Sequence, residues 1–287
     1  MRSGSVFRFN DTGVATCSAS RAPRLGACDV TVLSRKSVAR SLFLLNPRRV
    51  YHRAEIHGVE RIPESGGALL VSNHGRLDFD CFILASLILH SKARVVRLLA
   101  DHLWFGLPVI SDVWTSAGAV DGTRENAAQL LGAGELVLAY PGGVREIMGS
   151  RFGRESLAWE GRTGFATVAL EAGVPIIPVA SLGVNNGHVF LSSGRHLGRL
   201  LFRRMLRLGP EYAGYRDPLT LGLLPVPLPF SLAVHAPWPC KVRYVVGEPV
   251  HPSGTAADLA AQVTGAMEEL LRTGARGSAH LGEGFLR

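Results

Sequence analysis

The chain has few cysteines, and their spacing forms no pattern. Cys17, Cys28, Cys81 and Cys240 are spread over 287 residues without a C-x-x-C pair. Structural zinc sites and disulfide scaffolds need closely spaced cysteines, so the sequence indicates neither. The scarcity of cysteine is consistent with a reducing compartment.

Long hydrophobic runs are also missing. A membrane-spanning helix needs roughly 18 to 20 apolar residues. The stretch 79–89 is too short and contains Asp80, and the stretch 219–234 is interrupted by three prolines. With 47% hydrophobic and 19% charged residues, the chain can still bury a substantial core. We therefore expect a folded protein that is soluble or peripheral to a membrane.

Acidic residues are scarce near the N-terminus. Residues 1–53 hold ten basic and two acidic side chains, so the whole formal net charge of +8 lies there, and the remainder balances 21 basic with 21 acidic residues. Residues 54–287 show neither a cluster of basic residues interleaved with aromatic ones nor a helix-turn-helix pattern. The charge therefore does not indicate a nucleic-acid partner.

Residues 1–33 are rich in Ser, Arg, Ala and Gly but lack the apolar core of a secretory signal. An organelle transit peptide and a disordered tail both remain open. Residues 34–53 predict a basic amphipathic helix. It could lie on an anionic membrane, gaining about 1 kcal/mol per basic residue near the surface, or pack on the domain with its basic side in water. The main domain is expected over 54–275, and 276–287 as a flexible C-terminus.

From residue 54 onward, short apolar runs alternate with helical patterns. This alternation predicts an α/β domain with a mostly parallel central sheet flanked by helices, with ligands at the carboxyl ends of the strands. The expected strands span 54–59, 67–71, 94–100, 135–140, 174–180 and 241–247, and the expected helices span 79–90, 124–131, 164–172, 195–208 and 256–272.

A histidine and two carboxylates follow the second expected strand. His74, Asp78 and Asp80 lie on the turn that leads into the helix 79–90. An aspartate can hold an imidazole in one tautomer while the imidazole takes a proton from a hydroxyl, which suits general base catalysis. Taken alone, such a pair is more often a structural hydrogen bond.

Three further stretches support the catalytic interpretation. Gly118 to Arg124 places an arginine after a tight segment. Tyr140-Pro141-Gly142-Gly143-Val144-Arg145-Glu146 follows a strand, and its exposed amides and arginine could hold an anion or an oxyanion. Residues 173–179 resemble a buried strand with prolines at its ends.

Together and in this order, the four stretches resemble the glycerolipid acyltransferase superfamily, whose first block is a histidine and an aspartate on a short spacer. The similarity is closer to the branch of type 2 diacylglycerol acyltransferases and their transmembrane-protein relatives. In that branch the third block reads P-G-G-x-R-E, as residues 141–146 do here. The resemblance covers about residues 54–272 and implies the α/β fold of that superfamily.

The resemblance also implies roles for individual residues. His74 would be the base and Asp80 its partner, because the nearest relatives leave five residues between them where the wider superfamily leaves four. Phe79 occupies the four-residue position here. Asp78, one residue short of that position, is the alternative partner.

The third block would bind substrate through Gly142, Gly143, Arg145 and Glu146. Phospholipid-making members have E-G-T-R there, and the replacement of that glutamate by Gly142 favours a neutral acceptor. Arg124 lies where the second block's arginine is found, and either substrate binding or a structural salt bridge is compatible with it.

The implied activity is transfer of a fatty acyl group from acyl-CoA or acyl-carrier protein to a neutral lipid hydroxyl, such as that of mono- or diacylglycerol or a long-chain alcohol. The co-substrate is the acyl donor, and neither a further cofactor nor a metal is expected. No G-x-S-x-G nucleophile elbow is present, which argues against a serine hydrolase. The alternatives are a lysophospholipid or glycerol-phosphate acyltransferase and a non-catalytic lipid-binding protein.

The expected partners are the lipid acceptor, the acyl donor and a membrane surface. We expect peripheral attachment at the cytoplasmic face, with organelle targeting left open. Two segments could contribute: the helix 195–208, which carries an arginine every four residues, and the apolar, proline-rich stretch 219–239. The competing interpretation is a solvated helix face for the first segment and a structural loop for the second.

Overall fold

Seven short apolar segments form one sheet in the computed structural model, which describes residues 35–45, 47–75, 80–105, 108–143, 146, 155–159, 161–186 and 240–279. The spatial order of the strands is β1-β7-β6-β2-β5-β3-β4. All neighbouring strands pair in parallel except β6 and β7, which are antiparallel. The strands are β1 (Glu55–His57), β2 (Ala68–Ser72), β3 (Val96–Ala100), β4 (Ala119–Asp121), β5 (Leu136–Ala139), β6 (Ile176–Leu182) and β7 (Arg243–Val246).

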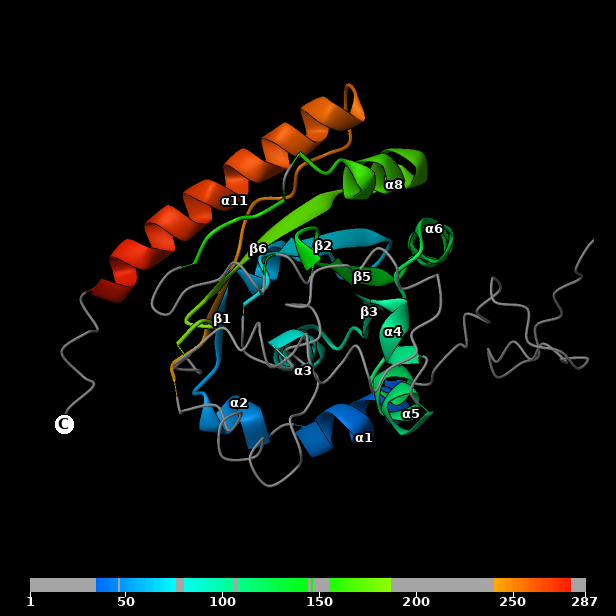
Figure 1. The fold of residues 1–287 in the computed structure, drawn as a ribbon, viewed down its shortest axis with the longest axis vertical. Helices are drawn as coiled ribbons and strands as arrows, with labels where there is room; N and C mark the ends of the chain where they lie inside the picture. Colours follow the sequence, from blue (N-terminus) through cyan, green and yellow to red (C-terminus); the bar gives the residue numbers. More distant parts are fainter. Residues whose placement is uncertain are drawn as a thin grey trace, which may run out of the picture.

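Helices cover both faces of the sheet, so the fold is the expected α/β arrangement with a mostly parallel sheet (Figure 1). One layer holds α6 (Arg124–Gly132), α8 (Gly164–Ala172) and α11 (Ala256–Ala279). The other holds α1 (Arg35–Leu45), α2 (Pro47–Tyr51), α3 (Asp80–Lys92), α4 (His102–Phe105) and α5 (Pro108–Ser116). A short 3₁₀ helix, η1 (Val59–Arg61), follows β1.

The core consists of two main apolar clusters, one on each side of the sheet. Successive residues of a strand point to opposite faces. Leu70 therefore packs with the α3 side, whereas Leu69 and Val71 pack with the α6, α8 and α11 side. Because β2 is covered on both faces, it is fully buried, and it is apolar from Ala68 to Val71. The histidine turn thus begins from the most enclosed part of the sheet.

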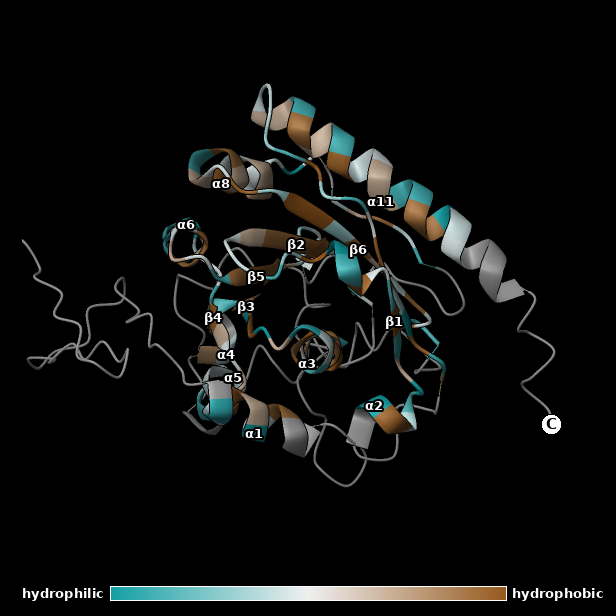
Figure 2. Ribbon diagram, turned by 180° about the vertical axis from the view of Figure 1, so that it is seen from behind, coloured by the Kyte–Doolittle hydropathy of each residue, from teal (hydrophilic) through white to brown (hydrophobic). Residues whose placement is uncertain are grey.

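Helices α3 and α11 show two different kinds of burial. Most of α3 is buried, and it is hydrophobic nearly all round, as expected for a helix enclosed by protein. Helix α11 is amphipathic, and its hydrophobic and hydrophilic residues alternate along its length (Figure 2). Its inner side contributes Leu259, Val263 and Met267 to the core. Each such side chain stabilises the fold by about 1.5 to 3 kcal/mol.

The segment expected as a basic amphipathic helix over 34–53 forms two helices, α1 and α2. Val38 and Leu42 of α1 are buried in the same cluster as α3, while Lys36 and Arg40 are exposed. The apolar side of α1 therefore packs on the domain, and its basic side is exposed.

The six expected strands are all present, whereas β4 was not expected. Of the expected helices, 195–208 lies outside the described residues, as do the segments 1–33 and 219–239. Within the described ranges, no helix combines the length and apolar character needed to cross a membrane.

Candidate active site

The site lies where β2 ends, between β6 and β5 at the carboxyl edge of the parallel strands. The backbone there is fixed on both sides of His74. The Asn73 side chain donates to the Ser181 carbonyl (2.9 Å) and accepts from the Ser181 N–H (2.7 Å). Gly75 packs so closely on Val184 that an added Cβ would lie 2.6 Å from the Val184 Cβ. The turn is therefore a rigid mount for the imidazole.

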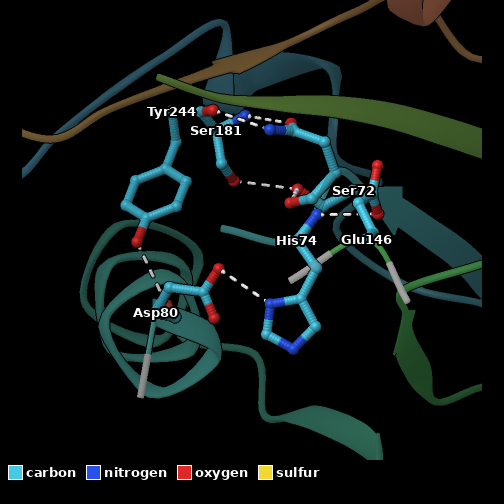
Figure 3. Close-up of polar contacts among 7 residues, drawn as sticks. Ser72, His74, Asp80, Glu146, Ser181 and Tyr244 are labelled. Atoms are coloured by element: carbon cyan, nitrogen blue, oxygen red, sulfur yellow. Dashed lines mark hydrogen bonds and ion pairs between the residues drawn. The ribbon is translucent and has the colours of Figure 1, made fainter. Parts of the chain in front are cut away.

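His74 and Asp80 face one another (Figure 3). The His74 Nδ1 lies 3.5 Å from the Asp80 Oδ2, the His74 side chain is 22% exposed and the Asp80 side chain is fully buried. Asp80 is the first residue of α3, where the helix dipole favours a negative charge. The other ring nitrogen of His74 points away from Asp80 (Figure 3). Asp78 lies outside the described residues.

The start of α3 is tied to the sheet by a tyrosine. The Tyr244 hydroxyl donates to the backbone carbonyl of Asp80 at 3.0 Å (Figure 3). Tyr244 comes from β7 and is completely buried. This hydrogen bond holds the first residue of α3 against β7. The contact joins residues 164 positions apart, so the sequence alone did not reveal it.

Tyr140, which follows β5, provides one wall of the imidazole site. Its ring stacks on the His74 ring, with centroids 4.3 Å apart and an interplanar angle of 29°. Burial raises the pKa of the Tyr140 hydroxyl well above its ordinary value, and the Asp80 charge adds to that effect. The phenol is therefore neutral. The sequence analysis did not select Tyr140, although it directly precedes the Pro-Gly-Gly block.

Glu146 is buried beneath the same block, with 2% of its surface exposed. Its Oε2 accepts the backbone N–H of His74 at 3.0 Å (Figure 3). Its Oε1 accepts the backbone N–H of Ala158 at 3.2 Å. Burial raises the pKa of Glu146 to about 7, against the lowering effect of these two hydrogen bonds. The carboxyl group is therefore close to its titration point at neutral pH.

The glycine pair shapes the turn above Glu146. A Cβ added to Gly142 would lie 2.6 Å from the Glu146 Cβ, so only glycine leaves room for that side chain. Gly143 has a positive φ of 54°, and its N–H donates to the Tyr140 carbonyl at 3.0 Å. The Arg162 Nη1 donates to the Pro141 carbonyl at 2.7 Å. Arg145 lies outside the described residues.

Arg124 is the first residue of α6, after the N-cap Thr123. Its exposed side chain reaches the start of α8, where a Cβ added to Gly164 would lie 3.5 Å from one guanidinium nitrogen. It forms no ion pair with any other described residue, so the structural salt bridge that the sequence left open is not seen in the described part of the chain.

His74, Asp80 and Glu146 thus meet at one place, with Gly142 and Gly143 in the turn above. A buried carboxylate behind a partly exposed imidazole is an arrangement that can remove a proton from a hydroxyl. Across the described segments, no group of three His, Cys, Asp or Glu side chains is placed to hold a metal ion.

The comparisons with known proteins bear on the same segment. The family model described as Acyltransferase matches residues 53–182, which include every site residue named above from His74 to Arg162. A human protein named "DGAT1/2-independent enzyme synthesizing storage lipids" is 34% identical over 224 residues, covering 77% of this chain and 62% of that protein. Its counterpart from Bos taurus is 34% identical over 77% of this chain and 60% of that protein.

An uncharacterised protein of Mycobacterium tuberculosis is 36% identical over 204 residues, covering 70% of this chain and 52% of that protein. The chain therefore spans between half and two thirds of the length of these relatives. The crystal structure of the 1-acyl-sn-glycerophosphate (LPA) acyltransferase PlsC from Thermotoga maritima aligns with 88% of this chain and 82% of that one, with a TM-score of 0.49 and 19% identity.

Proposed function

The chain belongs to the glycerolipid acyltransferase superfamily, and on that basis we propose that it transfers a fatty acyl group from acyl-CoA or acyl-carrier protein to a neutral lipid hydroxyl. The acceptor would be mono- or diacylglycerol or a long-chain alcohol. The observation that carries the proposal is the pairing of the partly exposed His74 imidazole with the fully buried Asp80 carboxylate at 3.5 Å.

In the proposed mechanism His74 acts as a general base. With Nδ1–H directed at Asp80, the free Nε2 takes the proton of the acceptor hydroxyl as its oxygen attacks the thioester carbonyl. The Asp80 carboxylate stabilises the imidazolium that forms. When the tetrahedral intermediate collapses, the C–S bond breaks and the thiolate takes the proton from His74. No covalent enzyme intermediate is needed.

The oxyanion of that intermediate needs a donor. The Gly143 N–H already donates to the Tyr140 carbonyl, which makes it a poor candidate. We assign the role to an arginine, Arg124 or Arg145, or to an amide near Gly142. The exposed position of Arg124 next to the start of α8 supports its inclusion.

Two observations support a neutral acceptor. Gly142 replaces the glutamate of the E-G-T-R block found in phospholipid-making members, and in the structure it makes room for Glu146. The names of the human and bovine relatives also refer to storage lipids. A lysophospholipid acceptor is the second candidate, because Arg145 is retained in the sequence.

We further propose that the protein works at a membrane surface as a peripheral protein. Val50 and Tyr51 at the end of α2 are 72% and 49% exposed, and Arg53, which follows them, is exposed as well. Apolar side chains next to basic ones suit an anionic lipid surface. Because the cytoplasmic leaflet carries the anionic lipids, we place the protein on that face.

An acyl-transfer assay tests the proposal. Purified protein is incubated with labelled oleoyl-CoA or oleoyl-carrier protein and with diacylglycerol, monoacylglycerol, hexadecanol or lysophosphatidic acid, beside the variant His74→Ala. We expect product with a neutral acceptor, and none with His74→Ala. Preference for lysophosphatidic acid would favour the second candidate. Equal inactivity of both proteins with both donors would favour a lipid-binding protein instead.

A further inference from the structure

We propose that Glu146 is a positioning residue for the catalytic base, and that it acts through the backbone N–H of His74 and not through the substrate. The inference rests on the proposed role of His74 as general base. The resemblance in the sequence places Glu146 in a substrate-binding block, so the structure assigns it a different task.

The hydrogen bonds of Glu146 carry the argument. Both carboxylate oxygens are used, one by the His74 N–H and one by the Ala158 N–H, at 3.0 and 3.2 Å. With 2% of its surface exposed, Glu146 presents no face to an incoming substrate. When the carboxyl group is ionised, these two hydrogen bonds are among the stronger ones in proteins. The carboxylate therefore joins the histidine turn to the segment 155–159.

The close contact with Gly142 shows that this position is built for the carboxylate. Any larger residue there would meet the Glu146 side chain, because an added Cβ would lie 2.6 Å from its Cβ and 2.7 Å from its Cδ. Glu146 is thereby held from above by the glycine turn and from both ends by amides. One side chain thus couples the glycine turn and the segment 155–159 to the histidine turn, which lies 72 positions away in sequence.

The effect on catalysis follows from how the histidine turn is held. Asn73 is fixed by Ser181, and Gly75 is fixed by Val184. The N–H of His74 lies between these anchors, and Glu146 is its acceptor. If the acceptor is lost, the turn must rotate to satisfy a part-buried amide. A displacement of about 1 Å at a catalytic group can cost about a hundredfold in rate.

The first test compares Glu146→Gln with Glu155→Gln. Glu155 is a matched control because it is also a largely buried carboxylate that accepts two backbone amides, from Gly183 at 2.7 Å and from Asn185, and burial raises its pKa too. Glu155 holds the amides on either side of Val184, so it bears on the histidine turn only through the packing of Val184 on Gly75, whereas Glu146 accepts the His74 N–H directly. Glutamine keeps the size of the side chain but leaves only one accepting oxygen.

We expect Glu146→Gln to lower kcat about 10- to 100-fold with an unchanged KM for donor and acceptor, and Glu155→Gln to lower kcat by a clearly smaller factor. An unchanged kcat in Glu146→Gln would overturn the proposal. A raised KM with an unchanged kcat would indicate substrate binding instead. Equal losses of kcat and of Tm in both variants would indicate a structural role only.

A second variant displaces Glu146 without changing its charge. Gly142→Ala should reproduce the loss of kcat, because the new methyl group occupies the space of the Glu146 side chain. Gly132→Ala is its control, since a Cβ added there meets nothing within 4 Å. Normal kcat in Gly142→Ala would contradict the coupling of the glycine turn to the base.

A readout without substrate separates this inference from the proposed function. Amide hydrogen exchange at His74 should become at least about tenfold faster in Glu146→Met, which has a side chain of similar size but no oxygen to accept the His74 N–H, and it should be unaffected in Glu155→Gln. Faster exchange in a protein that transfers no acyl group would support the contact while refuting the reaction. Unchanged exchange would refute the positioning role whatever the activity.

Discussion

The Asp80 carboxylate faces the His74 Nδ1 across 3.5 Å, and within the described part of the chain neither of its oxygens has a hydrogen-bond donor besides this ion-pair contact. A buried carboxylate needs compensation for its charge, and here the imidazole provides it together with the N-terminal end of the α3 dipole. The dependence is mutual, because the tautomer of His74 is set by the carboxylate.

We therefore expect Asp80→Asn to lower kcat about 10²- to 10⁴-fold, the range that general acid–base catalysis contributes. The measurement is the steady-state rate with the best acceptor. Asp78→Asn is the control and should be nearly as active as the wild type. The reverse result, with Asp78 essential and Asp80 dispensable, would make Asp78, with three residues between it and His74, the partner of the imidazole.

The stacking of His74 on Tyr140 leads to a second prediction. An aromatic pair contributes about 0.5 to 1.5 kcal/mol beyond its buried area, so Tyr140→Leu should lower kcat about 3- to 10-fold by loosening the imidazole. Tyr140→Phe keeps the ring and removes a buried hydroxyl that has no hydrogen-bond partner among the described residues. It should keep its activity and be at least as stable in thermal unfolding. Loss of activity in Tyr140→Phe would show that the hydroxyl takes part in the reaction.

Much of this architecture was predictable from the sequence because it depends on local patterns. The apolar runs at 67–71 and 174–180 read as buried strands, and the spacing of His74 and Asp80 indicated a pair. Strand β4 (Ala119–Asp121) escaped prediction because the stretch 118–124 was interpreted as a tight segment that leads to Arg124.

The supports of the site were not predictable in the same way. The contact between Asn73 and Ser181 joins residues 108 positions apart, and that between His74 and Glu146 joins residues 72 positions apart. Such pairs depend on the order of strands in the sheet, which a single sequence does not state. The block 141–146 was found by resemblance, yet the resemblance did not reveal that the Glu146 carboxylate faces backbone amides.

The exposed apolar residues of α2 predict the mode of membrane attachment. Burying a valine side chain in the lipid interface contributes about 1.5 to 3 kcal/mol, so Val50→Glu should weaken binding to phosphatidylserine-containing vesicles about tenfold or more. Sedimentation of the protein with vesicles measures this. Gln129→Glu, on α6 across the sheet, adds the same charge and should bind as the wild type does. Equal binding of all three proteins would mean that attachment lies elsewhere in the chain.

The carboxyl group of Glu146 predicts how stability depends on pH. Its pKa in the folded protein is about 7, against an ordinary value of 4.5, and burial is the main cause. The folded protein therefore binds a proton that the unfolded chain has released between pH 4.5 and 7. Stability from this group is greatest below pH 4.5 and is lost as the pH rises through 7. Between pH 5 and 8 the loss amounts to about 2 to 3 kcal/mol.

Glu146→Gln removes this titration, so the difference in unfolding free energy between the two proteins should change with pH. Urea unfolding at pH 5, 6, 7 and 8 measures that difference. Relative to the variant, the wild type should be most stable at pH 5 and should lose this extra stability by pH 8. Taking the difference between the two proteins cancels the effects of all titrating groups that they share. A difference that is constant across this range would show that Glu146 is ionised throughout. In that case its two amide hydrogen bonds, and not its burial, would determine its pKa.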